Sequence, residues 1–330
     1  MSGSTGGQPL HRQAVGMLVA ATVCWALSFP VMKALALAQH QLVAQEGSWF
    51  FTSLGIAYRF GGAGLFTLAV LCWRRECPTR LEFEQGLKIA TFGTAGILFQ
   101  MDGLAYIDAS TSAFLTQGYC LFIPLWVAMT NRRWPGMKIF ISTILVLAGV
   151  AMLAGVNLHS WKFGRGEWET LLASLLFTGQ ILLLERPKFA ANRPLHFSTV
   201  MFLAIALFCA PVVWLTAPDA ATCLRAYSSV PAIGFLVVLI VVCTLAAYLL
   251  MNQWQKHVSA TEAGLIYCAE PLFASCLCLF LPGLFGAWTG INYSNENLTE
   301  RLLVGGGLIT AANVWLQSKW MNPHTANVPA

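Results

Sequence analysis

Residues 265–276 read LIYCAEPLFASC, and this stretch places a carboxylate, Glu270, beside Pro271 inside an otherwise apolar run. The surrounding chain explains the setting, because 57% of its 330 residues are hydrophobic and only 10% are charged. A typical water-soluble domain is about one quarter charged. The charges are also gathered into short clusters between long apolar runs. The composition therefore indicates an all-α integral membrane protein, with Glu270 within a spanning segment.

Ten apolar segments have about the length, near 20 residues, that a helix needs to cross a bilayer. Short loops join most of them, which favours antiparallel neighbours. The ten segments lie at residues 14–38, 50–73, 86–107, 110–130, 138–156, 166–184, 197–216, 231–252, 261–282 and 302–317.

The basic residues predict an orientation. With the N-terminus inside, thirteen of the nineteen Lys and Arg residues fall in inner segments, four in outer loops, and two, Lys33 and Arg59, within spans. Cytoplasmic loops are enriched in Lys and Arg. We therefore expect both termini in the cytoplasm and the chain in a plasma (inner) membrane.

An internal repeat divides the chain. STSAFLTQGYCLFIPLW (110–126) and ATEAGLIYCAEPLFASC (260–276) both begin with small polar residues and Thr-x-Ala and then run apolar to a proline. The repeat predicts halves at 14–156 and 166–317, flanked by tails at 1–13 and 318–330. Five helices per half is an odd number, so consecutive halves would have opposite orientations. Inverted repeats are typical of secondary transporters with a central substrate site.

Several motifs carry a family resemblance. They are CWALSFPVMKAL (24–35), YRFGGAGL (58–65), AFLTQGYCLFIPL (113–125), EPLFA (270–274) and ENLTERLLVGGGLI (296–309). Their order and spacing resemble the EamA-type, ten-helix members of the drug/metabolite transporter superfamily. The departures are Ala26, where the family usually has glycine, and a longer outer insertion before Glu296. The resemblance implies a transporter, often an exporter of metabolites or amino acids.

Four ionisable residues lie within the expected spans, where a charge is costly and marks a candidate functional site. Glu270 is interpreted as a carboxylate for proton coupling or for a substrate ammonium group, or as a structural partner of backbone groups freed by Pro271. The Arg59 side chain can reach the depth of Asp102 in the membrane, which predicts an ion pair between them. Alternatively, Arg59 anchors an anionic substrate group. Lys33 either lines the pathway or extends to the interface.

Uncharged residues complete the set of candidates for substrate binding or coupling. Each polar one could instead form a helix–helix hydrogen bond. The polar candidates in the spans are Ser28, Gln100, Thr116, Gln117, Gln180, Tyr248, Asn252 and Asn313, and the aromatic candidates for apolar walls are Trp25, Phe29, Tyr119 and Tyr267.

The sequence lacks the motifs of several other classes of protein. There is no Walker A sequence, no H-x-x-x-H pair in a span and no basic module of a nucleic-acid-binding kind. We expect no cofactor, no metal and no nucleic-acid partner. The sequence favours a secondary transporter that moves a small metabolite or amphipathic solute by alternating access, as an exporter. Protons are a candidate coupling ion, facilitated exchange or uniport fits the sequence equally, and a homodimer is a further expectation. An integral-membrane enzyme and a non-transporting receptor or scaffold are the alternatives.

Overall fold

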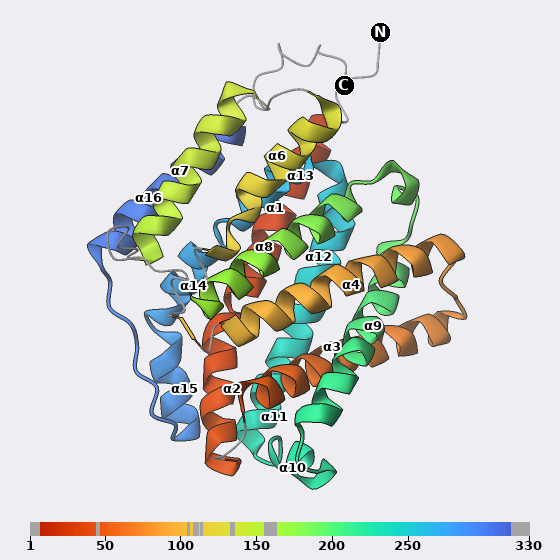
Figure 1. Cartoon of the computed structure of the whole chain (residues 1–330), viewed down its shortest axis with the longest axis vertical. Coiled ribbons are helices and arrows are strands. Elements are labelled where there is room, and N and C mark those ends of the chain that lie inside the picture. Colours follow the sequence, from red (N-terminus) through yellow and green to blue (C-terminus); the bar gives the residue numbers. More distant parts are fainter. Residues whose placement is uncertain are drawn as a thin grey trace.

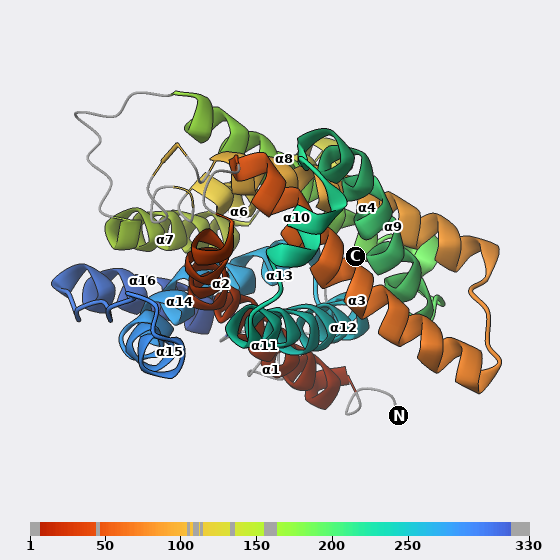
Figure 2. The same ribbon diagram turned by 90° about the horizontal axis from the view of Figure 1, so that it is seen from below.

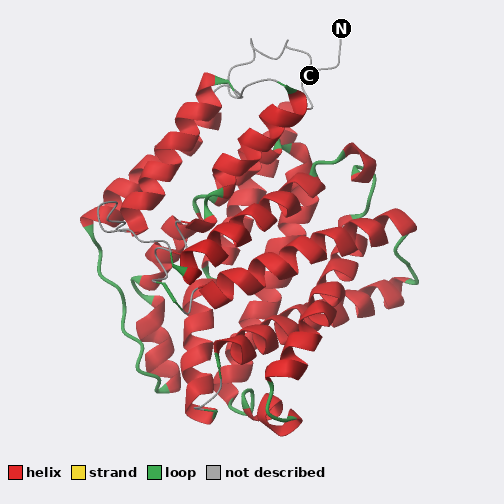
Figure 3. Cartoon of the chain, viewed as in Figure 1, coloured by secondary structure: helices red, strands yellow, loops and turns green. Residues whose placement is uncertain are grey.

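The computed structural model describes residues 7–43, 47–103, 106–107, 112, 115–132, 136–154 and 164–317. Every regular element in these ranges is a helix (Figure 3). The expected all-helical fold is therefore confirmed for this part of the chain.

The helices follow one another with short connections. In chain order they are α1 (Gly7–Ala26), α2 (Ser28–Leu42), α3 (Ser48–Arg74), α4 (Arg80–Gly103), α6 (Tyr119–Asn131), α7 (Met137–Ala154), α8 (Arg165–Leu184), a 3-10 turn (Pro187–Phe189), α9 (Pro194–Thr216), α10 (Ala220–Arg225), α11 (Val230–Ile240), a π-helical turn (Val241–Ala246), α12 (Ala247–Trp254), a 3-10 turn (Gln255–His257), α13 (Ala260–Tyr267), α14 (Glu270–Cys278), α15 (Leu281–Thr289) and α16 (Glu300–Gln317).

Each of the ten expected segments contains a described helix, but the segments differ in length and polarity. Five helical stretches in the described ranges are long and apolar enough to cross a membrane, namely Pro9–Leu42, Ser48–Arg74, Arg165–Leu184, Pro194–Thr216 and Val230–His257. A sixth is obtained if Ala260–Cys278 and Leu281–Thr289, which meet at a bend of 51°, form one span. Ten crossings in two inverted halves stay a prediction.

The expected span over 261–282 consists of shorter helices. The chain leaves the helix after Tyr267, starts α14 at Glu270 and starts α15 at Leu281. Pro271 occupies the first turn of α14, where proline is tolerated because the backbone N–H it lacks would have no partner within the helix. Glu270 therefore lies at a helix start and not in the middle of a continuous helix.

Helices that hold equivalent positions in the two halves pack together. The helix α3 lies along α9, and α7 lies along α16 (Figures 1 and 2). Glycines permit both approaches: a Cβ on Gly64 would lie 2.7 Å from Leu203 Cδ2, and one on Gly149 would lie 2.7 Å from the Gly305 carbonyl oxygen. Close packing through small residues is characteristic of helices in lipid. This arrangement agrees with a duplicated chain.

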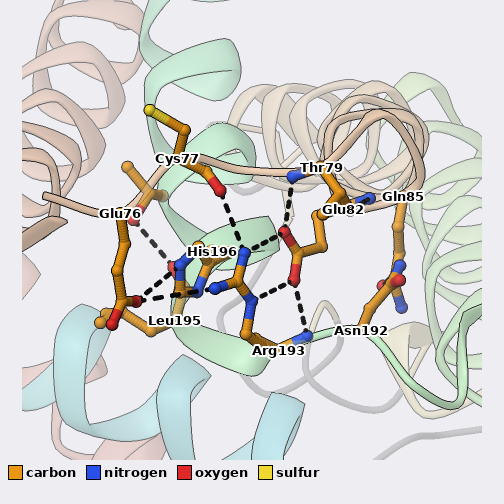
Figure 4. A network of polar contacts seen from close by, with 10 residues as sticks. Glu76, Cys77, Thr79, Glu82, Gln85, Asn192, Arg193, Leu195 and His196 are labelled. Atoms are coloured by element: carbon orange, nitrogen blue, oxygen red, sulfur yellow. Dashed lines mark hydrogen bonds and ion pairs between the residues drawn. The ribbon is translucent and has the colours of Figure 1, made fainter.

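A polar network joins the α3–α4 connection to the start of α9 (Figure 4). Glu82, which is 2% exposed, accepts hydrogen bonds from Arg193 Nε at 2.8 Å and from the Arg193 backbone N–H at 3.0 Å. Its other oxygen accepts from the Thr79 backbone N–H at 2.7 Å. On the far side of Arg193, Glu76 lies 2.9 Å from His196 Nε2. The network fixes the first half of the chain to the second.

The network sets the charge of Glu82, which lies outside the expected span 86–107. Burial by itself raises the pKa of this carboxyl group, but the hydrogen bonds from Arg193 and Thr79 outweigh it and lower the pKa to about 2. A depressed carboxyl pKa stabilises the fold above the ordinary glutamate pKa, and that stability is lost as the pH falls toward the folded-state value.

Replacing Glu82 by Gln should lower the free energy of unfolding at pH 7 by about 1.5–3 kcal/mol, since charged hydrogen bonds are removed. The difference in Tm between wild type and E82Q should shrink as the pH falls from about 5 to 2, measured by thermal unfolding in detergent. Glu84→Gln is the matched control, because Glu84 is half-exposed and pairs with Lys88 and Lys188 at the surface. Equal losses in E82Q and E84Q would contradict the assignment.

Candidate functional site

A cavity lies between helices of both halves and encloses about 830 Å³, counting its open mouth. Its walls carry one guanidinium group, one carboxylate, three tyrosines and a tryptophan. The lining residues are Trp25, Ser28, Phe29, Met32, Arg59, Ile97, Gln100, Met101, Thr116, Tyr119, Phe177, Gln180, Ile181, Tyr248, Met251, Tyr267 and Glu270. A concave, mostly apolar site with a few convergent polar groups is the usual form of a small-molecule site.

Two helix interruptions border the cavity. Trp25 and Ser28 stand on either side of Leu27, where α1 gives way to α2. Tyr267 ends α13 and Glu270 begins α14. Both breaks are slight, because Leu27, Cys268 and Ala269 keep right-handed helical backbone angles. The residues that flank them line the cavity.

Aromatic rings form one wall. The Trp25 ring makes edge contacts with the rings of Tyr248 and Tyr267, with centroids 5.3 Å apart in each pair. Phe60 extends the cluster behind Tyr248 at 5.6 Å. Trp25 Nε1 is buried and has no acceptor among the described residues. This wall therefore offers apolar surface, and Trp25 Nε1 is an unused hydrogen-bond donor on it.

Arg59 is held by the π-helical turn that follows α11. Its Nε donates to Thr244 Oγ1 at 2.5 Å, and its Nη2 donates to the Cys243 carbonyl oxygen at 2.7 Å. Nη1 lies 3.7 Å from Met32 Sδ, a weak contact at the cavity. The guanidinium is thus fixed along one edge and leaves donors free along the other, and π turns frequently accompany functional sites.

The expected ion pair between Arg59 and Asp102 is wrong. Asp102, which is 0% exposed, lies 2.6 Å from Arg165 Nη2 and accepts a hydrogen bond from Ser48 Oγ at 3.3 Å. Equal depth in two helices says nothing about which neighbouring helix each side chain faces. Asp102 instead joins α4 to the starts of α3 and α8, and it does not line the cavity.

Glu270 lines the cavity from the start of α14. No hydrogen bond or ion pair joins its carboxylate to any residue within the described ranges. A role in capping backbone groups freed by Pro271 therefore has no contact to support it there. The charge of Arg59 acts on this carboxylate, and a carboxylate that lines a cavity can exchange a proton or meet a solute.

The remaining predicted candidates divide into two sets. Phe29, Tyr119, Gln100 and Gln180 line the cavity, and Gln100 Nε2 donates to Thr116 Oγ1 at 3.0 Å. The others lie away from it. Lys33 is exposed and stands 5.3 Å over the Tyr293 ring, Gln117 is buried elsewhere, Asn252 donates to Ser198 Oγ at 2.8 Å, and Asn313 donates to the Ile309 carbonyl oxygen of its own helix.

Sequence reasoning missed the apolar part of the lining. Met32, Ile97, Met101, Phe177, Ile181 and Met251 all border the cavity. No signal in the sequence distinguishes them, because an apolar residue in an apolar span has the same appearance whether it faces lipid, core or cavity.

Across the described residues, no group of three or more His, Cys, Asp or Glu could hold a metal ion.

The Asp102 site yields a stability prediction. Arg165→Ala should lower the free energy of unfolding by about 1–3 kcal/mol, since it leaves Asp102 buried with only Ser48 as partner. The double variant D102N/R165A should recover part of that loss, because the neutral amide needs no counter-charge. Thermal or denaturant unfolding of the four proteins of this cycle measures the coupling, and strictly additive losses would refute it.

Comparisons with known proteins identify relatives of this chain. Residues 12–155 and 170–285 match the model of the EamA-like transporter family. A curated relative from Archaeoglobus fulgidus, named an uncharacterized transporter, is 24% identical over 193 residues, which are 58% of this chain and 59% of the relative. This chain thus spans about three fifths of the length of that relative. A solved structure titled only "Crystal structure of protein" is 17% identical, with a TM-score of 0.68 over 95% of this chain and 99% of that one. At that identity the likeness shows the fold alone.

Proposed function

Because this chain belongs to the EamA-like transporter family, we propose that it moves a small amphipathic solute across the membrane by alternating access, as an exporter. The observation that carries the proposal is the cavity itself. It is lined by helices of both halves, and it brings Arg59 and Glu270 together with aromatic rings. A site between two halves can face either side of the membrane in turn when the halves rock.

The cavity walls define the chemistry of the solute. The free edge of Arg59 suits an anionic or strongly accepting group, and Trp25 Nε1 can donate a further hydrogen bond. The rings of Tyr248 and Tyr267 suit an apolar body. We therefore assign an amphipathic solute with an acidic or carbonyl-bearing head near Arg59.

Glu270 is the proposed coupling group. Its carboxylate faces the cavity without a partner in the described part of the chain, so a proton can reach it from the same opening as the solute. Protonation would remove a charge from a site of low polarity, which favours movement of the halves past each other. In this scheme an inward proton gradient drives solute export.

Competing functions differ in an observable way. The family is one of transporters, which agrees with a non-enzymatic chain. A receptor or scaffold would bind a solute but would produce no flux. Comparative metabolomics of cells with and without the chain, on the cells and on the medium, identifies the exported solute, and flux of that solute from proteoliposomes then tests transport.

Arg59→Gln should reduce that flux at least tenfold, since the guanidinium donors facing the solute are lost. Thr244→Val should act in the same direction but less strongly, because it removes the acceptor that orients Nε. Lys33→Gln is the matched control, being a charged residue of the same half that lies outside the cavity. Flux in R59Q equal to that in K33Q would overturn the role of Arg59.

Glu270→Gln should abolish the response of solute flux to an imposed pH gradient, because the amide cannot take up a proton. Exchange of labelled for unlabelled solute without a gradient should persist in E270Q. The measurement is uptake into proteoliposomes with and without a pH difference. An unchanged gradient response would exclude Glu270 as the coupling group and leave uniport or exchange.

A further inference from the structure

One end of the cavity is closed by buried residues. All eight residues of α13 are buried, and this helix lies between the cavity and the membrane face at which α1 begins. Its place at that face follows from Glu262, whose carboxylate lies 3.1 Å from His11 Nε2 in the first turns of α1. In Figure 1, α13 stands beside α1 at the same end of the molecule. We call this end of the cavity the closed end.

A buried amide lies beneath the cavity at the closed end. Gln255 is 0% exposed and stands just after α12. Its Oε1 accepts from the Tyr267 hydroxyl at 2.9 Å, and its Nε2 donates to the Ile181 carbonyl oxygen at 2.8 Å. Tyr267 and Ile181 both line the cavity, one on α13 and the other on α8. Gln255 thus joins two helices that line the cavity.

A second contact closes the same pair of helices nearer the surface. The backbone N–H of Ala260, at the start of α13, donates to Glu185 Oε2 at the end of α8, at 3.0 Å. Ser259 Oγ caps α13 by accepting from the Glu262 backbone N–H at 3.2 Å. Behind α13, Gly264 packs so closely on α6 that an added Cβ would lie 2.8 Å from Ile123 Cδ1.

We propose that Gln255 is the positioning residue that holds α8 against α13 and so keeps the closed end of the cavity shut. The inference rests on the proposed function, since alternating access requires this end to open. Opening separates Tyr267 from Ile181, and at least one of the two hydrogen bonds of Gln255 must then pass to water. A solute that packs on the Tyr267 ring acts on the same side chain that holds the closure, which links occupancy of the cavity to opening.

The test measures access to the cavity and needs no flux. A cysteine is placed at Ser28, which lines the cavity, and a membrane-impermeant maleimide is added to either face of sealed vesicles. Protease access to an N-terminal tag identifies the face at which α1 begins. The parent protein without the Ser28→Cys change supplies the background from native cysteines.

Gln255→Leu should raise the labelling rate from the face at which α1 begins by about tenfold, as expected when two hydrogen bonds that favour the closed form are lost. Labelling from the other face should fall. Asn252→Leu is the matched control, because Asn252 is also a buried amide, bonded to Ser198 Oγ at 2.8 Å within the second half, but does not touch the cavity. It should leave labelling from both faces unchanged.

Tyr267→Phe keeps the ring and removes only the hydroxyl, so it tests the closure if Q255L fails to fold. It should raise labelling from the same face by a smaller factor. Labelling rates in both variants equal to that of the protein with the Ser28→Cys change alone, or an equal rise in N252L, would overturn the proposal. Altered labelling in a protein that shows no solute flux would uphold the closure and refute the proposed function, so the two can fail separately.

Discussion

The need to satisfy every backbone hydrogen bond away from water governs this fold. In lipid that need is met by helices, and the described regular elements are all helical. Three departures from regular helix lie beside the cavity or its lining residues. The interruption at Leu27, the break between Tyr267 and Glu270 and the π turn 241–246 all border the cavity or hold a residue that lines it. Where a backbone carbonyl is left available there, at Cys243, Arg59 takes it up.

Three carboxylates in the fold, Glu82, Asp102 and Glu270, have different surroundings. Glu82 is surrounded by donors from Arg193 and Thr79 at the edge of the fold. Asp102 is fully buried yet paired with Arg165. Glu270 lines the cavity within electrostatic reach of Arg59, without a hydrogen bond or ion pair in the described ranges. Since a carboxylate is costly at membrane depth, this residue is the proposed coupling group.

Two residues that line the cavity also bond to neighbouring parts of the fold. Tyr267 presents its ring to the solute space and its hydroxyl to Gln255. Arg59 likewise presents one edge to the cavity and the other to the turn after α11. In the proposed mechanism, each side chain therefore connects the solute space to a helix that moves when access changes. Coupling of this kind needs no long-range relay, because the contacts are direct.

The sequence by itself determined the membrane setting, the helical fold and the family resemblance, because these depend on composition, period and motif order. It also identified much of the polar lining, including Arg59, Glu270 and Tyr267, since polar groups in apolar spans are few. Only the tertiary structure decided that Asp102 pairs with Arg165 and that Lys33 lies outside the cavity. A sequence gives the depth of a side chain along its helix, but its partners depend on how the helix is rotated and which helices flank it. The breaks beside the cavity and the place of Gln255 depend on that same packing, so no linear pattern specifies them.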